Sequence, residues 1–359
     1  MKPAAINRLI KRHKAFWEMD EAEKPLIKLS PYTSLTRQGL PLRGGRFAVD
    51  NVRLTPEIVD VKAVAEWQEV PEKPVEGDLF TSVAPFGLCW TEAAVGCPIR
   101  MSVGSVWADP FLESLGDVDN LQFNPRNPWL LKLNELTNLL VEKTRGRSYV
   151  TQTLLRGPID IAAAALGYQR LCVELYRNPD EVEKLLSVCT ETFIETAKTH
   201  LSTIPQCREG FISGYEIWAP GSTVRSQTDN SVLLSPSTYV KHVLPYDRRV
   251  LQAFKYPVVH THQPCMSQVV QPLIEAQELK ALQFSLDRPN GPPVSDMIPL
   301  MRMVQEEKPL IITGPITENE LKLMLQTLSP KGLCLNTSVW TEEEWMKDLS
   351  PTESTRRNN

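Results

Sequence analysis

The sequence predicts an α/β protein built as a (β/α)8 TIM barrel with an N-terminal helical and irregular extension. From residue 79 onward, short apolar strands alternate with helices, a pattern typical of a parallel sheet. Roughly eight such strands, most of them followed by a helix, favour a closed barrel over an open doubly wound sheet. Neither G-x-G-x-x-G nor G-x-x-x-x-G-K-[ST] occurs, which argues against dinucleotide-binding and P-loop folds.

We expect three regions along the chain. Residues 1–75 form an N-terminal extension packed on the barrel, residues 76–349 form the barrel, and residues 350–359 form a flexible tail. The extension begins with a charged amphipathic helix of about Ala4 to Glu21 and continues as segments interrupted by prolines. The tail is polar throughout and therefore has nothing to bury.

The expected strands are short apolar segments between turn residues. They cover 79–85, 99–107, 149–155, 211–218, 257–262, 279–286, 309–313 and 332–339. Helices are expected between them: one ended by Gly96, then 129–145, 161–166, 180–200, 235–244, 271–278, 297–306 and 318–328. The last of these helices opens with a capping box, Thr317 with Glu320.

Composition narrows the function classes. The chain has 359 residues, of which 42% are hydrophobic and 23% charged, as in ordinary globular proteins. A net charge of −4 gives no basic surface for nucleic acid. No apolar run approaches the roughly 20 residues that span a membrane, and the first residues lack the apolar core of a signal peptide. Seven cysteines without a C-x-x-C pair do not form a disulfide framework. We expect a cytoplasmic protein.

Two histidines at the end of one apolar strand are the first candidate site. His260 and His262 are separated by one residue, so they share a face of the strand. Two imidazoles fixed on one side provide two neutral nitrogen ligands and predict a metal site. The alternative is that one or both histidines only form hydrogen bonds inside the barrel.

Other polar residues follow the expected strand ends, where the chemistry of a (β/α)8 barrel is located. Glu216 lies in an apolar strand and is interpreted as catalytic or as a metal ligand, with a salt bridge to Arg156 as the alternative. Asp287 is interpreted as a second catalytic residue, a ligand or base, or as a cap of the next loop. Arg156 and Trp218 are the candidate substrate contacts.

Cysteines offer a further metal ligand. Cys334 alternates with Asn336 and Ser338 on one face of the last strand, and its thiolate could complete a zinc site with the two histidines. The alternative is an inert buried thiol. Cys265 is close in sequence to the histidines, but it follows Pro264 in a loop and has no assured direction.

Three segments resemble the uroporphyrinogen decarboxylase superfamily. They are RGPIDIAAAALG at 156–167, ELYRNPDEVEKLL at 174–186 and LSPSTYVKHVLPY at 234–246. The resemblance runs over most of residues 79–345 and implies a (β/α)8 barrel. It also implies one of two chemistries: cofactor-free decarboxylation of uroporphyrinogen, or zinc-dependent methyl transfer that involves a corrinoid protein.

This chain departs from both patterns of the superfamily. The decarboxylases carry an RQAGR loop, to which Arg37-Gln38-Gly39 is the nearest stretch here. The methyltransferases carry H-x-C and a second cysteine near the last strand. Here His262 takes the place of the first cysteine, and the second would align near Ser338. The resemblance thus implies a metal site. Chemistry alone favours Glu216 as its third protein ligand and Cys334 after it, and Cys265 also remains open.

The expected function is a zinc-dependent methyltransferase that moves a methyl group between a small substrate and a corrinoid protein. His260 and His262 hold the metal, and Asp287 orients the substrate or handles a proton. A partner carries the corrinoid, because the chain lacks a D-x-H-x-x-G motif. Two alternatives remain open: a metal-independent decarboxylase or lyase acting on a carboxylated substrate, tetrapyrroles included, with Arg156 or Arg43 holding carboxylates, and a non-catalytic binding protein. For the oligomeric state of the protein, a homodimer also remains open.

Overall fold

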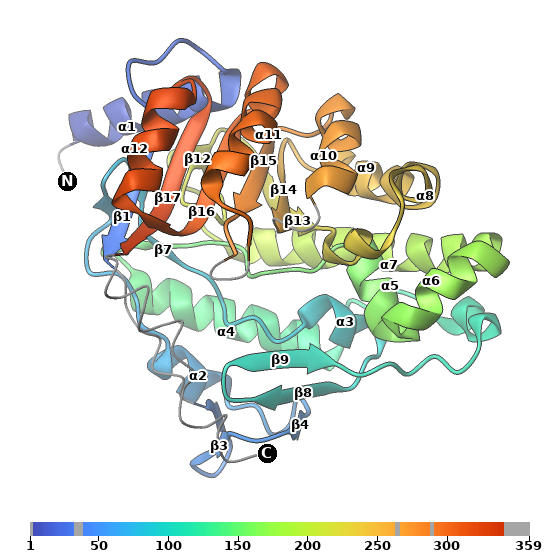
Figure 1. Cartoon of the computed structure of the whole chain (residues 1–359). Coiled ribbons are helices and arrows are strands. Elements are labelled where there is room, and N and C mark those ends of the chain that lie inside the picture. The colour runs from blue at the N-terminus through green and yellow to red at the C-terminus, as the bar shows by residue number, and fades with distance from the viewer. Residues whose placement is uncertain (1–2, 32–38, 263–265, 288–290, 341–359) are drawn as a thin grey trace, which may run out of the picture.

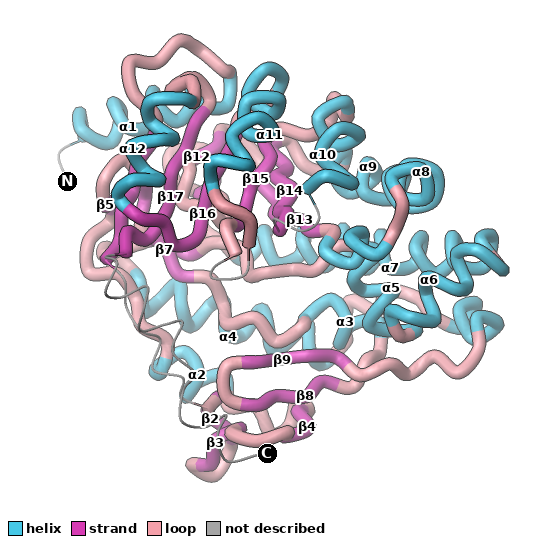
Figure 2. The backbone as a smooth tube through the Cα atoms, viewed as in Figure 1, coloured by secondary structure: helices cyan, strands magenta, loops and turns pink. Residues whose placement is uncertain are grey.

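The computed structural model describes residues 3–31, 39–262, 266–287 and 291–340 of the chain. The expected flexible tail, Cys265 and the Arg37-Gln38 pair lie outside the described residues. Figures 1 and 2 show one body in which helices and strands mix along the chain. Within the described part, no helix is both long and apolar enough to cross a membrane.

The centre of the fold is a six-stranded parallel sheet, so the prediction of an α/β protein with a parallel sheet is confirmed. Every neighbouring pair is parallel, and strands joined along the chain are neighbours in the sheet. Their carboxyl ends therefore meet at one edge. In spatial order the strands are β1 (Leu26–Pro31), β17 (Leu333–Trp340), β16 (Leu310–Thr317), β15 (Ala281–Ser285), β14 (Tyr256–His262) and β13 (Thr223–Gln227).

Helices that connect these strands lie along one face of the sheet (Figure 1). Amphipathic sequence forms them, and the predicted capping box is present at the start of α12, where Thr317 and Glu320 bond reciprocally. They are α8 (Pro236–Thr238), a π-helical turn (Tyr239–Val243), α9 (Leu244–Gln252), α10 (Met266–Glu275), α11 (Val294–Glu307) and α12 (Glu318–Thr327).

A second group of helices forms the other half of the core. The largest is α7, whose buried positions pack against α4, α5 and α9. Pro128 at the first turn and the Asn127 side chain, which accepts from the Trp129 N–H, begin α4. The group comprises α2 (Val61–Trp67), α3 (Trp90–Val95), α4 (Pro128–Thr144), α5 (Pro158–Leu166), α6 (Tyr168–Arg177) and α7 (Pro179–Thr203).

Short strands complete the structure. β7 and β10 form a parallel pair, while the hairpin β8–β9 with β4 forms an outer antiparallel sheet (Figure 2). Their bounds are β2 (Leu40–Leu42), β3 (Arg46–Ala48), β4 (Val52–Leu54), β5 (Val75–Glu76), β6 (Leu79–Phe80), β7 (Ser82–Val83), β8 (Ile99–Ser102), β9 (Ser105–Ala108) and β10 (Tyr149–Val150).

Two expected strands take another form. Residues 99–107 make the β8–β9 hairpin, because Val103-Gly104 turns the chain and Gly104 has φ of +78°. Residues 211–218 make a second hairpin, β11 (Phe211–Ile212) with β12 (Trp218–Ala219). Its turn includes Glu216, whose φ is +66°.

Two strands of the main sheet were missed in the sequence. β1 comes from the N-terminal extension and pairs with β17, so part of residues 1–75 belongs to the sheet itself. β13, residues 223–227, is the strand next to β14 and contains the polar residues Arg225 and Gln227. These polar side chains interrupt the apolar pattern, so a search for apolar runs does not find this strand.

The first helix, α1 (Pro3–Glu18), is fixed to the β12 backbone by two aromatic side chains. His13 Nδ1 accepts from the Trp218 N–H at 2.8 Å, and Trp17 Nε1 donates to the Trp218 carbonyl at 2.8 Å. His13 Nε2 lies 2.7 Å from the Asp78 carbonyl and therefore donates to it. Both ring nitrogens are used, and the neutral ring is completely buried.

A buried ion pair joins the N-terminal strand to the rest of the sheet. Lys28 Nζ lies 2.6 Å from Glu216 Oε2, and both side chains are 12% exposed. The other oxygen, Glu216 Oε1, accepts from the Ser82 N–H at 3.0 Å. The carboxylate thereby connects β1, β7 and the β11–β12 turn.

Acid should weaken the fold through His13. Burial lowers the pKa of His13 from 6.5 to about 4, so between these pH values the unfolded chain binds a proton that the native ring does not. The stabilisation is complete above pH 6.5 and is lost as pH falls to about 4; it amounts to about 3 kcal/mol. Denaturant titrations across this range should show this slope in the native chain. His13→Gln should lack that part of the slope, and equal slopes would contradict the assignment.

Removing Lys28 should be costly. Lys28→Met leaves the Glu216 carboxylate buried without its cation, and we expect a loss of about 3–5 kcal/mol in the free energy of unfolding. Adding Glu216→Gln should recover much of this loss, because the uncompensated charge disappears. Urea titrations of the three variants measure both effects. A double variant as unstable as Lys28→Met alone would show that packing, and not charge, sets the cost.

Candidate metal centre

His260 and His262 lie together at the carboxyl end of β14, as their spacing predicts. Their ring centroids are 4.5 Å apart and the ring planes are nearly perpendicular. His260 is buried, and His262 is partly open to solvent. The strand therefore holds two imidazoles next to each other at the edge of the sheet where the other parallel strands also end.

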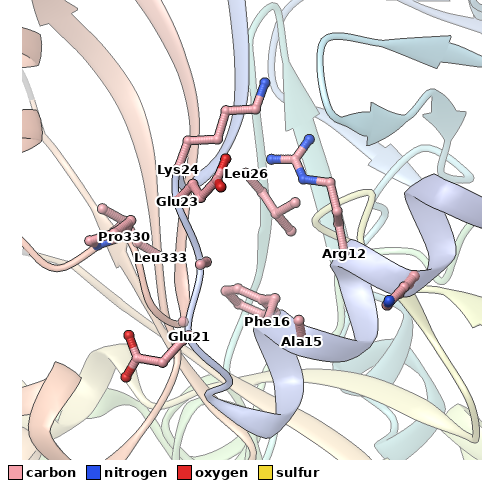
Figure 3. Close-up of a pocket in the computed structure, with 12 residues that line it drawn as sticks. Arg12, Ala15, Phe16, Glu21, Glu23, Lys24, Leu26, Pro330 and Leu333 are labelled. Atoms are coloured by element: carbon pink, nitrogen blue, oxygen red, sulfur yellow. The ribbon is translucent and has the colours of Figure 1, made fainter.

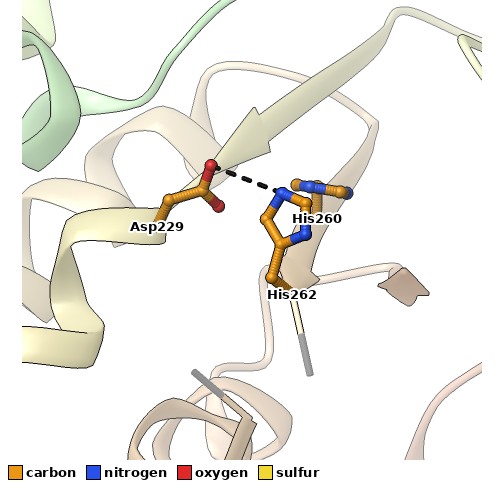
Figure 4. A group of neighbouring side chains, drawn as sticks. All are labelled: Asp229, His260 and His262. Atoms are coloured by element: carbon orange, nitrogen blue, oxygen red, sulfur yellow. Dashed lines mark ion pairs between the residues drawn. The ribbon is translucent and has the colours of Figure 1, made fainter. Parts of the chain in front are cut away.

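Asp229 is the third member of this group. It follows the neighbouring strand β13, whose last residue Gln227 is level with His260. Potential ligand atoms of Asp229, His260 and His262 all lie within 4.8 Å of one another. Figure 4 shows the carboxylate facing the two rings; the dashed line joins Asp229 Oδ2 to His262 Nε2, 3.7 Å apart. This is the spacing of side chains that can share one metal ion.

Asp287 fixes the orientation of the His262 ring. His262 Nδ1 lies 2.8 Å from Oδ1 and 2.9 Å from Oδ2 of the Asp287 carboxylate. A carboxylate accepts hydrogen bonds, so Nδ1 carries the proton and Nε2 faces Asp229. This hydrogen bond is the main cause of the raised pKa of His262. Carboxylates support metal-binding histidines in this way in many proteins.

Gln283 fixes the orientation of the His260 ring in the same way. Its Nε2 donates to Thr313 Oγ1 at 2.6 Å, which turns Oε1 toward His260 Nδ1. His260 Nδ1 therefore carries the proton and its Nε2 keeps a lone pair. Burial, followed by the charge of Arg225, lowers the pKa of His260 to about 2, so the ring is neutral. A neutral imidazole is the form that binds metals.

Residues of the first family-like motif shape this site from α5. Asp160 accepts from the Asn230 N–H at 2.8 Å and the Asp229 N–H at 3.3 Å, which holds the turn that carries Asp229. A Cβ on Gly157 would lie 2.0 Å from the Gln227 carbonyl oxygen, so only glycine allows this approach. Burial first, and then the Asp160 charge, raise the pKa of Asp229 to about 6.

The group opens into a cavity of about 430 Å³. Arg156, a candidate substrate contact, lies on its wall, and its guanidinium pairs with the fully buried Glu92 at 3.2 Å. Most of the wall is polar, unlike the core around it. The lining residues are Leu154, Arg156, Asp160, Arg225, Gln227, Asp229, Asn230, His260 and His262.

Three residues singled out in the sequence lie elsewhere. Glu216 is paired with Lys28, as described above. Cys334 is fully buried in the apolar cluster with Phe16 and Trp17, and burial raises the pKa of its thiol. Trp218 is buried against α1. None of the three lines the cavity or belongs to the His–His–Asp group.

A second cavity, of about 310 Å³, lies between α1 and the starts of β1 and β17 (Figure 3). Phe16, Leu26 and Leu333 form its apolar wall, with charged residues such as Glu21 and Lys24 around it. Its lining contains no histidine or cysteine. Because the other cavity brings two histidines and several further polar groups together, it is the better functional candidate.

Comparison with known proteins agrees with this architecture. Residues 71–207 match the family model of uroporphyrinogen decarboxylase (URO-D). This match covers two of the three family-like motifs, those at 156–167 and 174–186, so the resemblance seen in them is confirmed over this part of the chain. A structure of a methyltransferase from Methanosarcina mazei superposes with a TM-score of 0.57, at 16% identity, over 95% of this chain and 96% of that chain. The two share a fold. No curated protein matches the chain.

Metal binding should depend on Asp229 and not on Cys334. We expect about one zinc per chain, and Asp229→Asn, His260→Ala and His262→Ala should each weaken binding by at least about tenfold, because even supporting residues cost 10–100-fold. Cys334→Ala is the matched control and should bind like the native chain. Equilibrium competition with a chromophoric chelator measures these affinities. Loss of metal only in Cys334→Ala would contradict the site described here.

Proposed function

We propose that the protein is a zinc-dependent methyltransferase that moves a methyl group between a small substrate and a corrinoid protein. The observation that carries the proposal is the His260–His262–Asp229 group at the mouth of a polar cavity. The family match and the shared fold with a methyltransferase support the same class. The ligand set differs from the one expected, since Asp229 takes the place of Glu216 or Cys334.

The donor set fits zinc. Two imidazoles and one carboxylate are a common set of three protein ligands at catalytic zinc sites, where the fourth position is kept open. When bound there, zinc would act as a Lewis acid on the sulfur, oxygen or nitrogen atom of the substrate that exchanges the methyl group. Both histidines donate from Nδ1, so Nε2 is the nitrogen of each ring that would bind the metal.

Other residues of the cavity would bind and orient the substrate. Arg156, Arg225 and Asn230 contribute polar groups to the wall next to the ligands. The volume of about 430 Å³ is in the lower part of the range used for small ligands, about 300–1,000 Å³. Asp287 would keep the His262 ring in place and the proton on its Nδ1. The corrinoid would be brought by a partner protein.

We also infer that the sheet closes into a (β/α)8 barrel. Consecutive strands from β13 to β17 are neighbours and carry their helices on one face, the arrangement of a barrel wall. Backbone hydrogen bonds from Asp78 to Ile27 and from Phe80 to Glu216 link the β6–β7 segment to β1 and to the second hairpin. The β7–β10 pair would then complete the wall. An experimental structure with continuous pairing around the ring tests this inference.

A metal-independent decarboxylase or lyase is the second candidate. The two arginines on the wall, Arg156 and Arg225, favour it, because guanidinium groups bind carboxylates in fork geometry. This function would not need the His–His–Asp group. Activity that survives removal of metal by a chelator would favour the lyase over the methyltransferase.

Methyl exchange is the direct test of function. Protein loaded with zinc and mixed with methylated corrinoid carriers and a panel of small thiols, ethers and amines should transfer the methyl group, followed by the cobalamin absorption spectrum. Chelation or Asp229→Asn should abolish transfer, and adding zinc should restore it only in the native chain. Absence of exchange with every carrier, in samples shown to contain zinc, would sink the proposal.

A further inference from the structure

Arg225 is the starting point of a hydrogen-bond chain to Asp229. It lies in β13 and lines the cavity. One terminal nitrogen donates to Gln227 Oε1 at 2.8 Å, and Gln227 Nε2 donates to Asp229 Oδ2 at 2.8 Å. Gln227 is buried. One residue therefore separates the guanidinium from the carboxylate of the metal group.

A second chain runs from the same guanidinium to His260. Arg225 Nε donates to the Tyr215 hydroxyl at 2.9 Å, and that hydroxyl donates to Gln283 Oε1 at 2.8 Å. The same oxygen accepts from His260 Nδ1. Tyr215 and Gln283 are both buried. Arg225 is thus connected to two of the three candidate ligands through different edges of one planar group.

Arginine also sets the direction of every bond in the two chains. A guanidinium can only donate, so the Tyr215 oxygen accepts and its proton must point to Gln283. For the same reason Gln227 presents its oxygen to Arg225 and its amide protons to Asp229. Lysine cannot replace this arrangement, because a single ammonium does not offer two N–H groups at the fixed spacing of the fork.

From these contacts we propose that Arg225 is a positioning residue of the metal centre: it holds Asp229 and His260 in the geometry that binds the metal, without ligating the metal itself. The inference rests on the metal binding of the proposed function and names a residue that neither motif nor spacing had singled out. Gln227 connects Arg225 to Asp229, and Tyr215 followed by Gln283 connects it to His260.

The test measures metal affinity and ligand geometry in Arg225→Lys, Arg225→Gln, Tyr215→Phe and Gln227→Leu. Each should weaken zinc binding, the arginine variants by about 10–100-fold. In protein loaded with cobalt(II), the arginine variants should also shift the visible absorption bands that report coordination geometry. Arg248→Lys, which changes a surface arginine paired with Glu278, is the matched control and should leave both readouts unchanged.

A cycle of variants separates this role from a general effect on folding. If Tyr215 acts through Arg225, Tyr215→Phe should cost much less in the Arg225→Gln background than in the native chain. Thermal unfolding of the metal-free proteins identifies variants that are merely unstable, and Tyr215→Phe removes only one oxygen. Native affinity and cobalt spectrum in Arg225→Lys would overturn the inference.

The outcomes also separate this inference from the proposed function. A native chain that binds no metal overturns both. In another outcome, the native chain binds metal and the Arg225 variants lose affinity as expected, yet the protein transfers no methyl group to any acceptor. That result would support the positioning role of Arg225 and would reject the proposed methyltransferase function.

Discussion

The buried ion pair between Lys28 and Glu216 is the constraint on which the arrangement of the sheet depends. Its carboxylate contacts β1 through Lys28 and β7 through the Ser82 backbone, and it sits at a left-handed residue of the β11–β12 turn. Left-handed backbone is unfavourable for a side chain such as Glu216 and persists only where the surroundings hold it. The pair thus joins segments that are far apart in the chain. Glu216, a candidate catalytic residue by sequence, here stabilises the fold.

Much of the fold could be predicted because it follows from periodicity. The apolar strands β14 to β17 and their helices are regular, and the capping box at Thr317 marks a helix start in the sequence alone. β1 and β13 could not be found in this way. β1 is a strand whose partner, β17, comes from the other end of the chain, and β13 carries Arg225 and Gln227 toward the cavity. Both strands depend on tertiary contacts that local patterns do not contain.

The site was predicted in part for the same reason. His260 and His262 share a strand, so the period of two was enough to place them together. Asp229 belongs to another strand, and its position follows from the register between β13 and β14. Gln283 did leave a signal: it is a polar side chain inside the apolar strand β15, level with His260. The pairing of Glu216 with Lys28 could not be predicted, because Lys28 is distant in sequence.

Gly157 has a consequence for how relatives of this protein are recognised. Its missing side chain lets α5 approach the end of β13, next to the turn that Asp160 holds. The RGPID motif is therefore required by the backbone packing around the site and not by the candidate metal ligands. A chain can keep this motif and exchange a cysteine for a histidine two residues after His260 without disturbing the approach. Sequence recognition of this kind identifies a scaffold, while the side chains of the candidate metal group can differ from one relative to the next.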